Sequence, residues 1–235
     1  MPTLTSLLLT SLTLSHSLLA SPLSSDFLPR HSLQDDLPQT PNSVGHHDGY
    51  YYMWWTDGVH KATYNNLPGG KFSIIWKANT RESGGNFIGG KGWEDGKNRT
   101  IKYSGKFELT KKQYIAIYGM TQNPYNEFYI LDYHGTYNPG PSTAKKLGEV
   151  TCDDGDYEIY RRGWWEGGSP PGITMPTRIY SIRKQKRIGG IVRTGCHFEA
   201  WKKLDIDIGT ILFQIVAVEG YQSTGRAEIL VESPP

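Results

Sequence analysis

Two glutamates in strand-like runs are the residues of this chain best suited to chemistry. Glu127 follows a turn signal, Asn123-Pro-Tyr, and begins an alternating run. Because successive side chains of a strand point to opposite faces, Glu127 shares a face with other large side chains: Tyr129, Leu131 and Tyr133. A carboxylate beside tyrosines suits a sugar-binding cleft, and it equally suits an ordinary solvent-facing strand.

The second glutamate, Glu219, lies near the end of the apolar run 211–221. The same alternation puts it on a face with apolar residues, Phe213, Ile215 and Ala217. Burial at such an apolar margin would raise the pKa of the carboxyl group. A glycosidase needs one ionised carboxylate and one protonated carboxyl group, and these two glutamates could supply them. Strand alternation alone does not show that they face each other.

The elements that must position these acids are predicted to be β-strands. Strand-like runs separated by Gly and Pro turns recur in a chain with 27 Gly and 15 Tyr. The predicted runs are residues 50–55, 60–65, 71–77, 86–89, 99–104, 113–120, 127–134, 148–151, 155–162, 178–184, 190–194, 209–221 and 225–231. Residues 197–204 instead have helical periodicity, with Phe198 and Trp201 on one face. We therefore expect an all-β fold that curls or stacks in two layers, with one helix.

The N-terminal segment predicts export. Residues 1–20 have a Leu-rich core and end at Ala20-Ser21, a plausible cleavage point for a signal peptide, although no Lys or Arg precedes the core. The apolar run is too short to span a membrane, which favours a secreted, extracellular protein over an anchored one. Residues 21–47 lack periodicity and are predicted to be a flexible propeptide or linker. The folded domain is expected at residues 48–232.

Cysteine content and charge narrow the function classes further. In an oxidising compartment Cys152 and Cys196 can form only one intramolecular disulfide, and the alternative is two buried free thiols. Neither cysteine has metal-ligand spacing, so we expect no metal and no cofactor. Asn98 begins an Asn-Arg-Thr glycosylation sequon, which has meaning only in a secreted chain. A net charge of +2 weighs against a nucleic-acid partner.

Several motifs together resemble a known family. The motifs are residues 51–58, 85–93, 99–105, 123–129, 135–139, 157–161, 197–201 and 218–221. In order and spacing they resemble those of the family 11 glycoside hydrolases, which are endo-1,4-β-xylanases, and the resemblance covers about residues 48–232. The resemblance implies a β-jelly roll of two strongly bent antiparallel sheets, with one α-helix and a long cleft.

The resemblance also implies roles for the two acids. Glu127 is expected to be the nucleophile and Glu219 the general acid/base of a retaining mechanism. Such a mechanism passes through a covalent xylosyl-enzyme intermediate and places the carboxyl groups about 5 Å apart. The resemblance further implies that Cys152 and Cys196 form a bridge beside the start of the helix.

Four further residues are implied to bind substrate or to act on the two acids. Trp55 matches a sugar-stacking tryptophan, for which a core position is the alternative. Tyr118 and Tyr129 match tyrosines around the nucleophile. Asn86 matches the position beside the acid/base. Because an Asn cannot share a proton with Glu219, we expect a near-neutral rather than a strongly acidic pH optimum.

The chain departs from the family pattern near the nucleophile. Trp164 stands where an Arg is usual, and Arg178 stands where a Gln is usual. Residues 168–172 replace the usual tip of the thumb loop. Our hypothesis is that Arg178 lies against Glu127 and stabilises its ionised form, and so replaces the charge lost at Trp164.

The leading hypothesis is a secreted, monomeric endo-1,4-β-xylanase that cuts xylan internally with retention of configuration. The first alternative is a carbohydrate-binding or host-recognised protein on the same scaffold, with weakened catalysis. The second alternative is a hydrolase of another β-1,4-glycan. The presence of both glutamates favours an enzyme, because a binding module has no physical need of either.

Overall fold

The computed structural model describes residues 37–59, 61–78, 84–108, 112–163 and 177–234. The predicted signal peptide and residues 21–36 of the predicted linker lie outside these ranges. No helix within them is long and apolar enough to cross a membrane. The described chain forms two sheets and two helices, and each strand range predicted from the sequence overlaps an observed strand.

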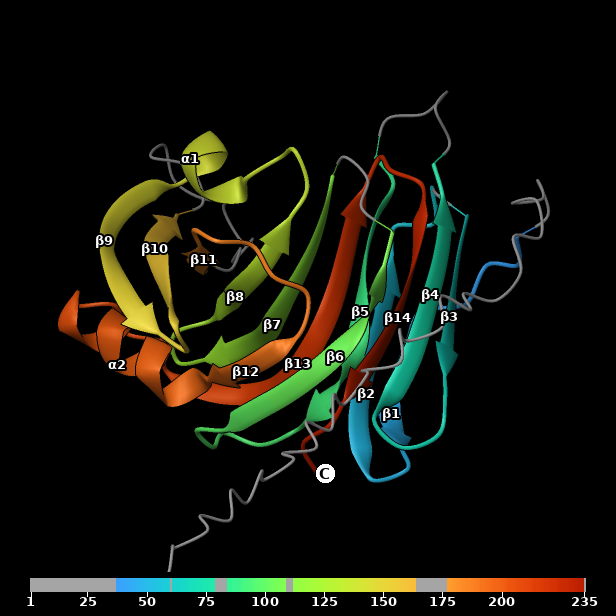
Figure 1. Cartoon of the computed structure of the whole chain (residues 1–235), viewed down its shortest axis with the longest axis horizontal. Coiled ribbons are helices and arrows are strands. Elements are labelled where there is room, and N and C mark those ends of the chain that lie inside the picture. Colours follow the sequence, from blue (N-terminus) through green and yellow to red (C-terminus); the bar gives the residue numbers. More distant parts are fainter. Residues whose placement is uncertain (1–36, 60, 79–83, 109–111, 164–176, 235) are drawn as a thin grey trace, which may run out of the picture. The chain divides into compact units, whose positions relative to one another are not determined.

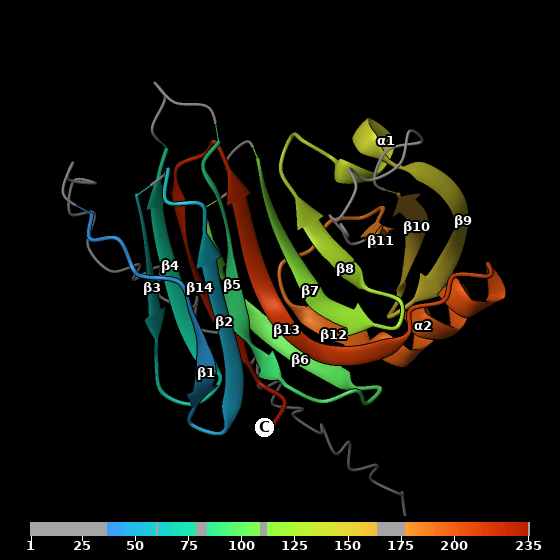
Figure 2. The same cartoon turned by 180° about the vertical axis from the view of Figure 1, so that it is seen from behind.

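The larger sheet has nine strands in the order β1-β2-β5-β13-β7-β8-β11-β10-β9. Figures 1 and 2 show it curling from β2 and β5 through the long strand β13 to β9. In chain order its strands are β1 (Ser43–His47), β2 (Tyr50–Thr56), β5 (Asn86–Trp93), β7 (Gln113–Gln122), β8 (Asn126–His134), β9 (Lys145–Cys152), β10 (Gly155–Arg162), β11 (Thr177–Arg183) and β13 (Thr210–Tyr221).

The smaller sheet has five strands in the order β12-β6-β14-β4-β3. They are β3 (Lys61–Asn66), β4 (Lys71–Lys77), β6 (Thr100–Phe107), β12 (Gly190–Arg193) and β14 (Gly225–Val231). The two helices are α1 (Pro139–Thr143) and α2 (Thr194–Lys203). The predicted helix corresponds to α2, whose Phe198 and Trp201 are buried.

The side chains of the larger sheet divide between two apolar clusters. One face packs with the smaller sheet and α2, and the fully buried aromatic residues of this shared cluster include Trp54 of β2, Trp76 of β4 and Trp201 of α2. The opposite face carries the second cluster, which includes Tyr118, Tyr129 and Ile215. The predicted catalytic and substrate-binding residues all belong to strands of this larger sheet, and their side chains share its second face.

The larger sheet is antiparallel except where β11 lies parallel to β8. This pairing sets Arg178 directly opposite Glu127. A register shift in the β7–β8 pairing places Tyr133 opposite Ile115, so that Tyr133 packs against the core cluster instead of the face of Glu127. The prediction for Tyr133 was wrong because a bulge reverses the alternation beyond Leu131.

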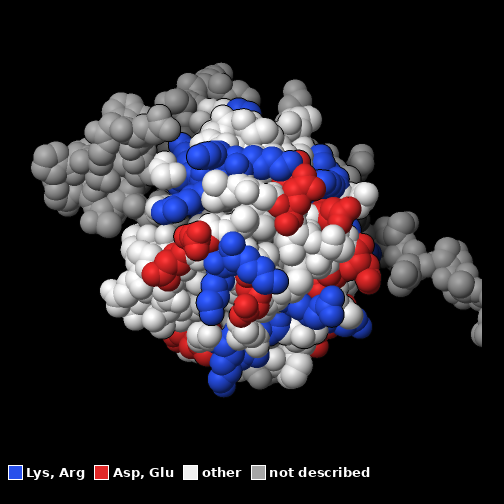
Figure 3. All heavy atoms as spheres, turned by 90° about the vertical axis from the view of Figure 1, so that its left-hand side faces the viewer, with Lys and Arg blue, Asp and Glu red and all other residues white. Residues whose placement is uncertain are grey.

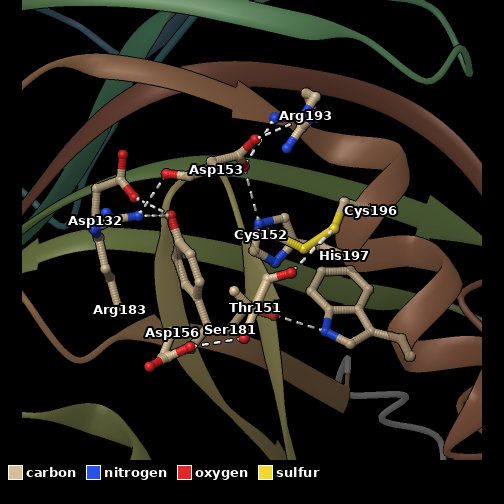
Figure 4. The surroundings of a disulfide bond; sticks show 12 residues. Asp132, Thr151, Cys152, Asp153, Asp156, Ser181, Arg183, Arg193, Cys196 and His197 are labelled. Atoms are coloured by element: carbon tan, nitrogen blue, oxygen red, sulfur yellow. Dashed lines mark hydrogen bonds and ion pairs between the residues drawn. A yellow bond between two sulfur atoms is a disulfide. The ribbon is translucent and has the colours of Figure 1, made fainter.

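The disulfide joins the end of β9 to the first turn of α2. Its Cys152 and Cys196 sulfur atoms lie 1.94 Å apart. The predicted pairing of the two cysteines is therefore confirmed. Figure 4 shows this bond beside His197, whose Nε2 lies 3.5 Å from a buried Asp153 carboxylate. The bond therefore holds the helix against the edge of the larger sheet.

Two elements were not predicted. Residues 43–47, assigned to the linker, form β1 and pair with β2. Helix α1 is a second helix at a site predicted to be a turn. It begins with a proline, and the side chain of Asn138 accepts a hydrogen bond from the backbone N–H of Gly140.

Candidate active site

Glu127 and Glu219 point from the same face of the larger sheet. Glu127 lies on β8 and Glu219 on β13, and β7 alone separates these strands. Each glutamate is two residues from a member of the second apolar cluster, Tyr129 for Glu127 and Ala217 for Glu219. Burial raises the pKa of Tyr118 most, and the negative charges of Glu127 and Glu219 raise it further. Both carboxylates therefore lie near the Tyr118 hydroxyl group.

Glu127 is held by two donors. Arg178 Nε donates to its Oε2 at 2.5 Å, and the Tyr118 hydroxyl donates to its Oε1 at 3.3 Å. The Glu127 side chain is only 13% exposed, whereas that of Arg178 is 37% exposed. The hypothesis that Arg178 lies against Glu127 therefore agrees with the geometry. One carboxylate oxygen is thus held by a guanidinium and the other by a hydroxyl group.

Glu219 has the opposite environment. Burial raises its pKa to about 7, and the nearby negative charge of Glu127 adds to the increase. The Arg178 guanidinium opposes this increase, as do hydrogen bonds from Tyr129 and Asn86. Its Oε2 is buried without a hydrogen-bond partner in the described part of the chain. Such a carboxyl group can hold a proton near neutral pH.

A row of tyrosines separates the two acids. The ring centroids of Tyr118 and Tyr129 lie 5.0 Å apart, and those of Tyr129 and Tyr180 lie 5.1 Å apart. In the strand register Tyr180 is opposite Tyr129, and Tyr129 is opposite Tyr118. The packed rings therefore fix the hydroxyl groups that reach toward the carboxylates.

Local hydrogen bonds position the strand starts. The turn before Glu127 is held by the Asn126 side chain, which donates to Thr121 Oγ1 and to the Pro124 carbonyl, both at 3.2 Å. At the start of β5, one Asp57 carboxylate oxygen accepts the backbone N–H groups of Gly85 and Asn86, at 2.7 and 2.9 Å. The Asn86 side chain is thereby held beside Glu219.

Trp55 lies on the same cleft face but farther along the sheet. It is opposite Ile88 of β5, which is in turn opposite Glu219 of β13. Its side chain is 38% exposed, unlike that of the buried neighbour Trp54. An exposed indole two strands from Glu219 is available for stacking on a sugar ring.

Some predictions fall outside this geometry. Trp164 and the loop at 168–172 lie outside the described residues. Within the described ranges there is no group of three His, Cys, Asp or Glu side chains that could hold a metal ion. Asn98 is exposed between β5 and β6, and its glycosylation stays a prediction.

Sequence reasoning missed several residues that line a pocket beside Glu219: Lys112, Tyr114, Tyr137 and Arg162. For Tyr114 and Arg162 a signal existed. The two-residue alternation places Tyr114 on the face of Tyr118, and Arg162 on the face of Tyr160.

Comparison with known proteins decides the family. The model of the glycosyl hydrolases family 11 matches residues 47–230. The chain belongs to this family. It is 47% identical over 193 residues to ethylene-inducing xylanase 5 of Verticillium dahliae, and the match covers 82% of each chain. It is 45% identical over 194 residues to an endo-1,4-beta-xylanase of Thermomyces lanuginosus, covering 82% of this chain and 84% of the relative.

A solved structure supports the fold of this glycosyl hydrolase. The structure is one of two major endo-1,4-beta-xylanases from Trichoderma reesei, and it superposes with a TM-score of 0.68 at 26% identity. The match covers 82% of this chain and all of that structure. The predicted jelly roll of two sheets is therefore confirmed.

Proposed function

We propose that the chain is a retaining endo-1,4-β-xylanase, with Glu127 as nucleophile and Glu219 as general acid/base. The observation that carries the proposal is the contrast between the two acids. Glu127 is paired with a guanidinium, whereas burial raises the pKa of Glu219 to about 7. A retaining glycosidase needs one carboxylate that attacks and one carboxyl group that donates a proton.

The reaction has two steps on one face of the sheet. Glu127 attacks the anomeric carbon while Glu219 gives its proton to the departing sugar oxygen, which breaks the glycosidic bond and leaves a xylosyl ester on Glu127. Ionised Glu219 then removes a proton from water, whose oxygen displaces Glu127. The β configuration is restored by the second displacement, and the expected carboxyl separation of about 5 Å stays a prediction.

The other cleft residues support this chemistry. Tyr118 and Arg178 hold Glu127 in one orientation through its two oxygens. Tyr129 and Asn86 lie against Glu219. Trp55 offers a flat surface to a sugar in the glycan chain. We further expect a secreted monomer, glycosylated at Asn98, that needs no cofactor.

The test is reducing-sugar release from xylan, cellulose and mixed-linkage glucan by the purified protein and its Glu127→Gln variant. We expect release from xylan, lowered by a factor of about 10³ or more in the variant because the attacking carboxylate is lost. Binding to xylan without release would support the carbohydrate-binding alternative. Release from a glucan alone would support a hydrolase of another β-1,4-glycan.

A further inference from the structure

The pocket beside Glu219 is unusually rich in positive charge. Three cationic side chains line it, on β10, on β11 and just before β7: Arg162, Arg178 and Lys112. Glu219 is the one carboxyl group among its described lining residues. Because burial raises the pKa of Glu219 to about 7, this carboxyl group offsets little of that charge in acidic solution.

Among the described residues, one of the three cations has an acidic partner. Arg178 pairs with Glu127 at 2.5 Å. Lys112 donates to the neutral Gln222 amide oxygen at 3.0 Å and lies 5.1 Å from the centroid of the Tyr221 ring. Arg162 lies within ion-pair distance of no carboxylate of the described chain. Within the described ranges its guanidinium therefore has no counter-charge.

The position of Arg162 is costly for the free protein. Arg162 is directly opposite Arg178 in the β10–β11 register, and both side chains are partly buried on the cleft face. Like charges directly opposite each other on neighbouring strands destabilise a sheet. Nothing in the described structure compensates for this cost at Arg162, but a bound anion would do so.

Exposed cations near β9, unlike Arg162, contact carboxylates. Figure 3 shows blue and red side chains interleaved on the side that carries β9 and α2. There Lys146 contacts Glu149 and Glu158, each at 2.7 Å, and Lys184 contacts Glu149 at 2.6 Å. Arg162, which faces into the cleft, has no such carboxylate partner among the described residues.

The strand order places Arg162 along the path of a glycan. In the sequence β2-β5-β13-β7-β8-β11-β10, Trp55 lies at one end, Glu219 near the middle and Arg162 at the other end. A glycan that crosses these strands and is cut at Glu219 would bring sugars beyond the scissile bond to Arg162. A neutral xylose offers no charge to a guanidinium, whereas a uronic acid side group offers a carboxylate in the planar geometry that Arg binds best.

We infer that Arg162, assisted by Lys112, forms a subsite for the carboxylate of a uronic acid carried as a side group on the xylan chain. This inference rests on the proposed function. The subsite makes the enzyme prefer acidic xylan over neutral xylan of the same backbone. The preference is electrostatic, so it weakens as salt screens the charges.

The test uses two matched polymers, a glucuronoxylan and the same sample with its carboxyl groups chemically reduced to alcohols. The quantity measured is the ratio of kcat/KM on the acidic polymer to kcat/KM on the reduced polymer. We expect the wild-type ratio to exceed one and to approach one in 0.5 M NaCl. Arg162→Gln should lower the ratio by about tenfold, which corresponds to loss of one charge-assisted interaction. Arg162→Lys, which keeps the charge without the planar fork, should lie between.

Arg161→Gln is the matched control. It removes the same charge one residue away, but Arg161 is exposed on the opposite face of β10. Its ratio should equal that of the wild type. An unchanged ratio in Arg162→Gln would overturn the inference, as would an equal fall in both variants, since that would indicate a general charge effect.

A binding measurement separates this inference from the proposed function. In a Glu219→Gln background, titration calorimetry compares a uronic-acid-substituted xylotetraose with its carboxyl-reduced form. Adding Arg162→Gln should weaken binding of the acidic ligand about tenfold. It should leave the affinity for the carboxyl-reduced ligand nearly unchanged. If neither polymer is cleaved, the proposed function fails. Equal affinities for the acidic xylotetraose with and without Arg162 would overturn the subsite, whatever the result for cleavage.

Discussion

Glu127 and Glu219 carry the same functional group in opposite surroundings. Arg178 and Tyr118 contact both oxygens of Glu127, whereas one oxygen of Glu219 is buried without a hydrogen-bond partner among the described residues. Hydrogen bonds and opposite charge favour an ionised carboxyl group, and burial favours a neutral one. The assignment of roles therefore depends on neighbours that come from four different strands.

If Glu219 is the proton donor, as proposed, its protonation should set the alkaline limit of activity. Because its pKa is raised to about 7, the proton donor is lost above about pH 7. We expect kcat/KM on neutral xylan to fall above this pH with a slope of one proton, and Glu219→Gln to lose activity by a factor of about 10²–10⁴. A pH–rate profile that peaks near pH 3 would contradict this assignment.

The same group affects stability, which provides a control independent of activity. Folding raises the pKa of Glu219 from 4.5 to about 7, so the folded chain holds a proton that the unfolded chain has released between these values. Its contribution to stability is present below about pH 4.5 and is lost as the pH rises through 7. Glu219→Gln should therefore increase the melting temperature more at pH 8 than at pH 4. Equal effects at both pH values would argue against a buried acid.

In the proposed mechanism Arg178 is a positioning residue, because it would act on substrate through Glu127. Arg178→Gln should lower kcat/KM on xylan by about 10- to 100-fold, as expected for loss of a charged hydrogen bond. Arg161→Gln provides the charge-matched control. Unchanged activity in Arg178→Gln would contradict a role in holding Glu127.

At the scale of elements, alternation and turn residues predicted the strands well, because these signals are local. They placed the two glutamates correctly on their strand faces. They did not predict the bulge near Asp132, which moves Tyr133 to the core face. A bulge depends on how a strand pairs with its neighbour, and a single strand carries little trace of it.

Strand neighbours were also beyond reach of the sequence pattern. That Arg178 contacts Glu127 follows from the parallel pairing of β11 with β8, and the hypothesis came from family resemblance and not from alternation. Strand β1 was missed because it is short and mostly polar, and because a Pro- and Ser-rich stretch precedes it. Its pairing with β2 overrides weak local preference.

The disulfide is the covalent link between a strand and the long helix. Cys152→Ser with Cys196→Ser should lower the free energy of unfolding by about 4 kcal/mol, because the closed loop of about 45 residues is released in the unfolded chain. Thermal unfolding with and without reductant measures this effect. Reductant should lower the melting temperature of the wild type and leave that of the double variant unchanged. A melting temperature equal to that of the wild type would contradict a stabilising bond.

At the scale of the whole domain, a buried acid links the two sheets. Asp132 of β8 is 1% exposed and accepts hydrogen bonds from Tyr103 of the smaller sheet at 2.9 Å and from Tyr157 of β10 at 2.7 Å. It also accepts Arg187 Nε at 2.9 Å. This buried cluster holds the layers in register through polar contacts inside an apolar core.

Removing that charge should destabilise the domain. Asp132→Asn should cost about 3–5 kcal/mol, because Arg187 would be left partly buried without its counter-charge. Asp156→Asn makes the same change at an exposed side chain, which accepts a hydrogen bond from Thr151, and should cost less than about 1 kcal/mol. Urea unfolding of the two variants measures the difference. Similar midpoints would show that the cluster contributes little.

The strand order has a consequence for how this protein is made. Strand β13 lies between β5 and β7, and β14 lies between β4 and β6. Both inserted strands come from residues 210–231, near the end of the chain. A ribosome that has synthesised the first two hundred residues has therefore produced a chain in which both sheets still lack an interior strand. Native assembly must wait for the last strands, so the growing chain cannot complete either sheet while it is still being synthesised.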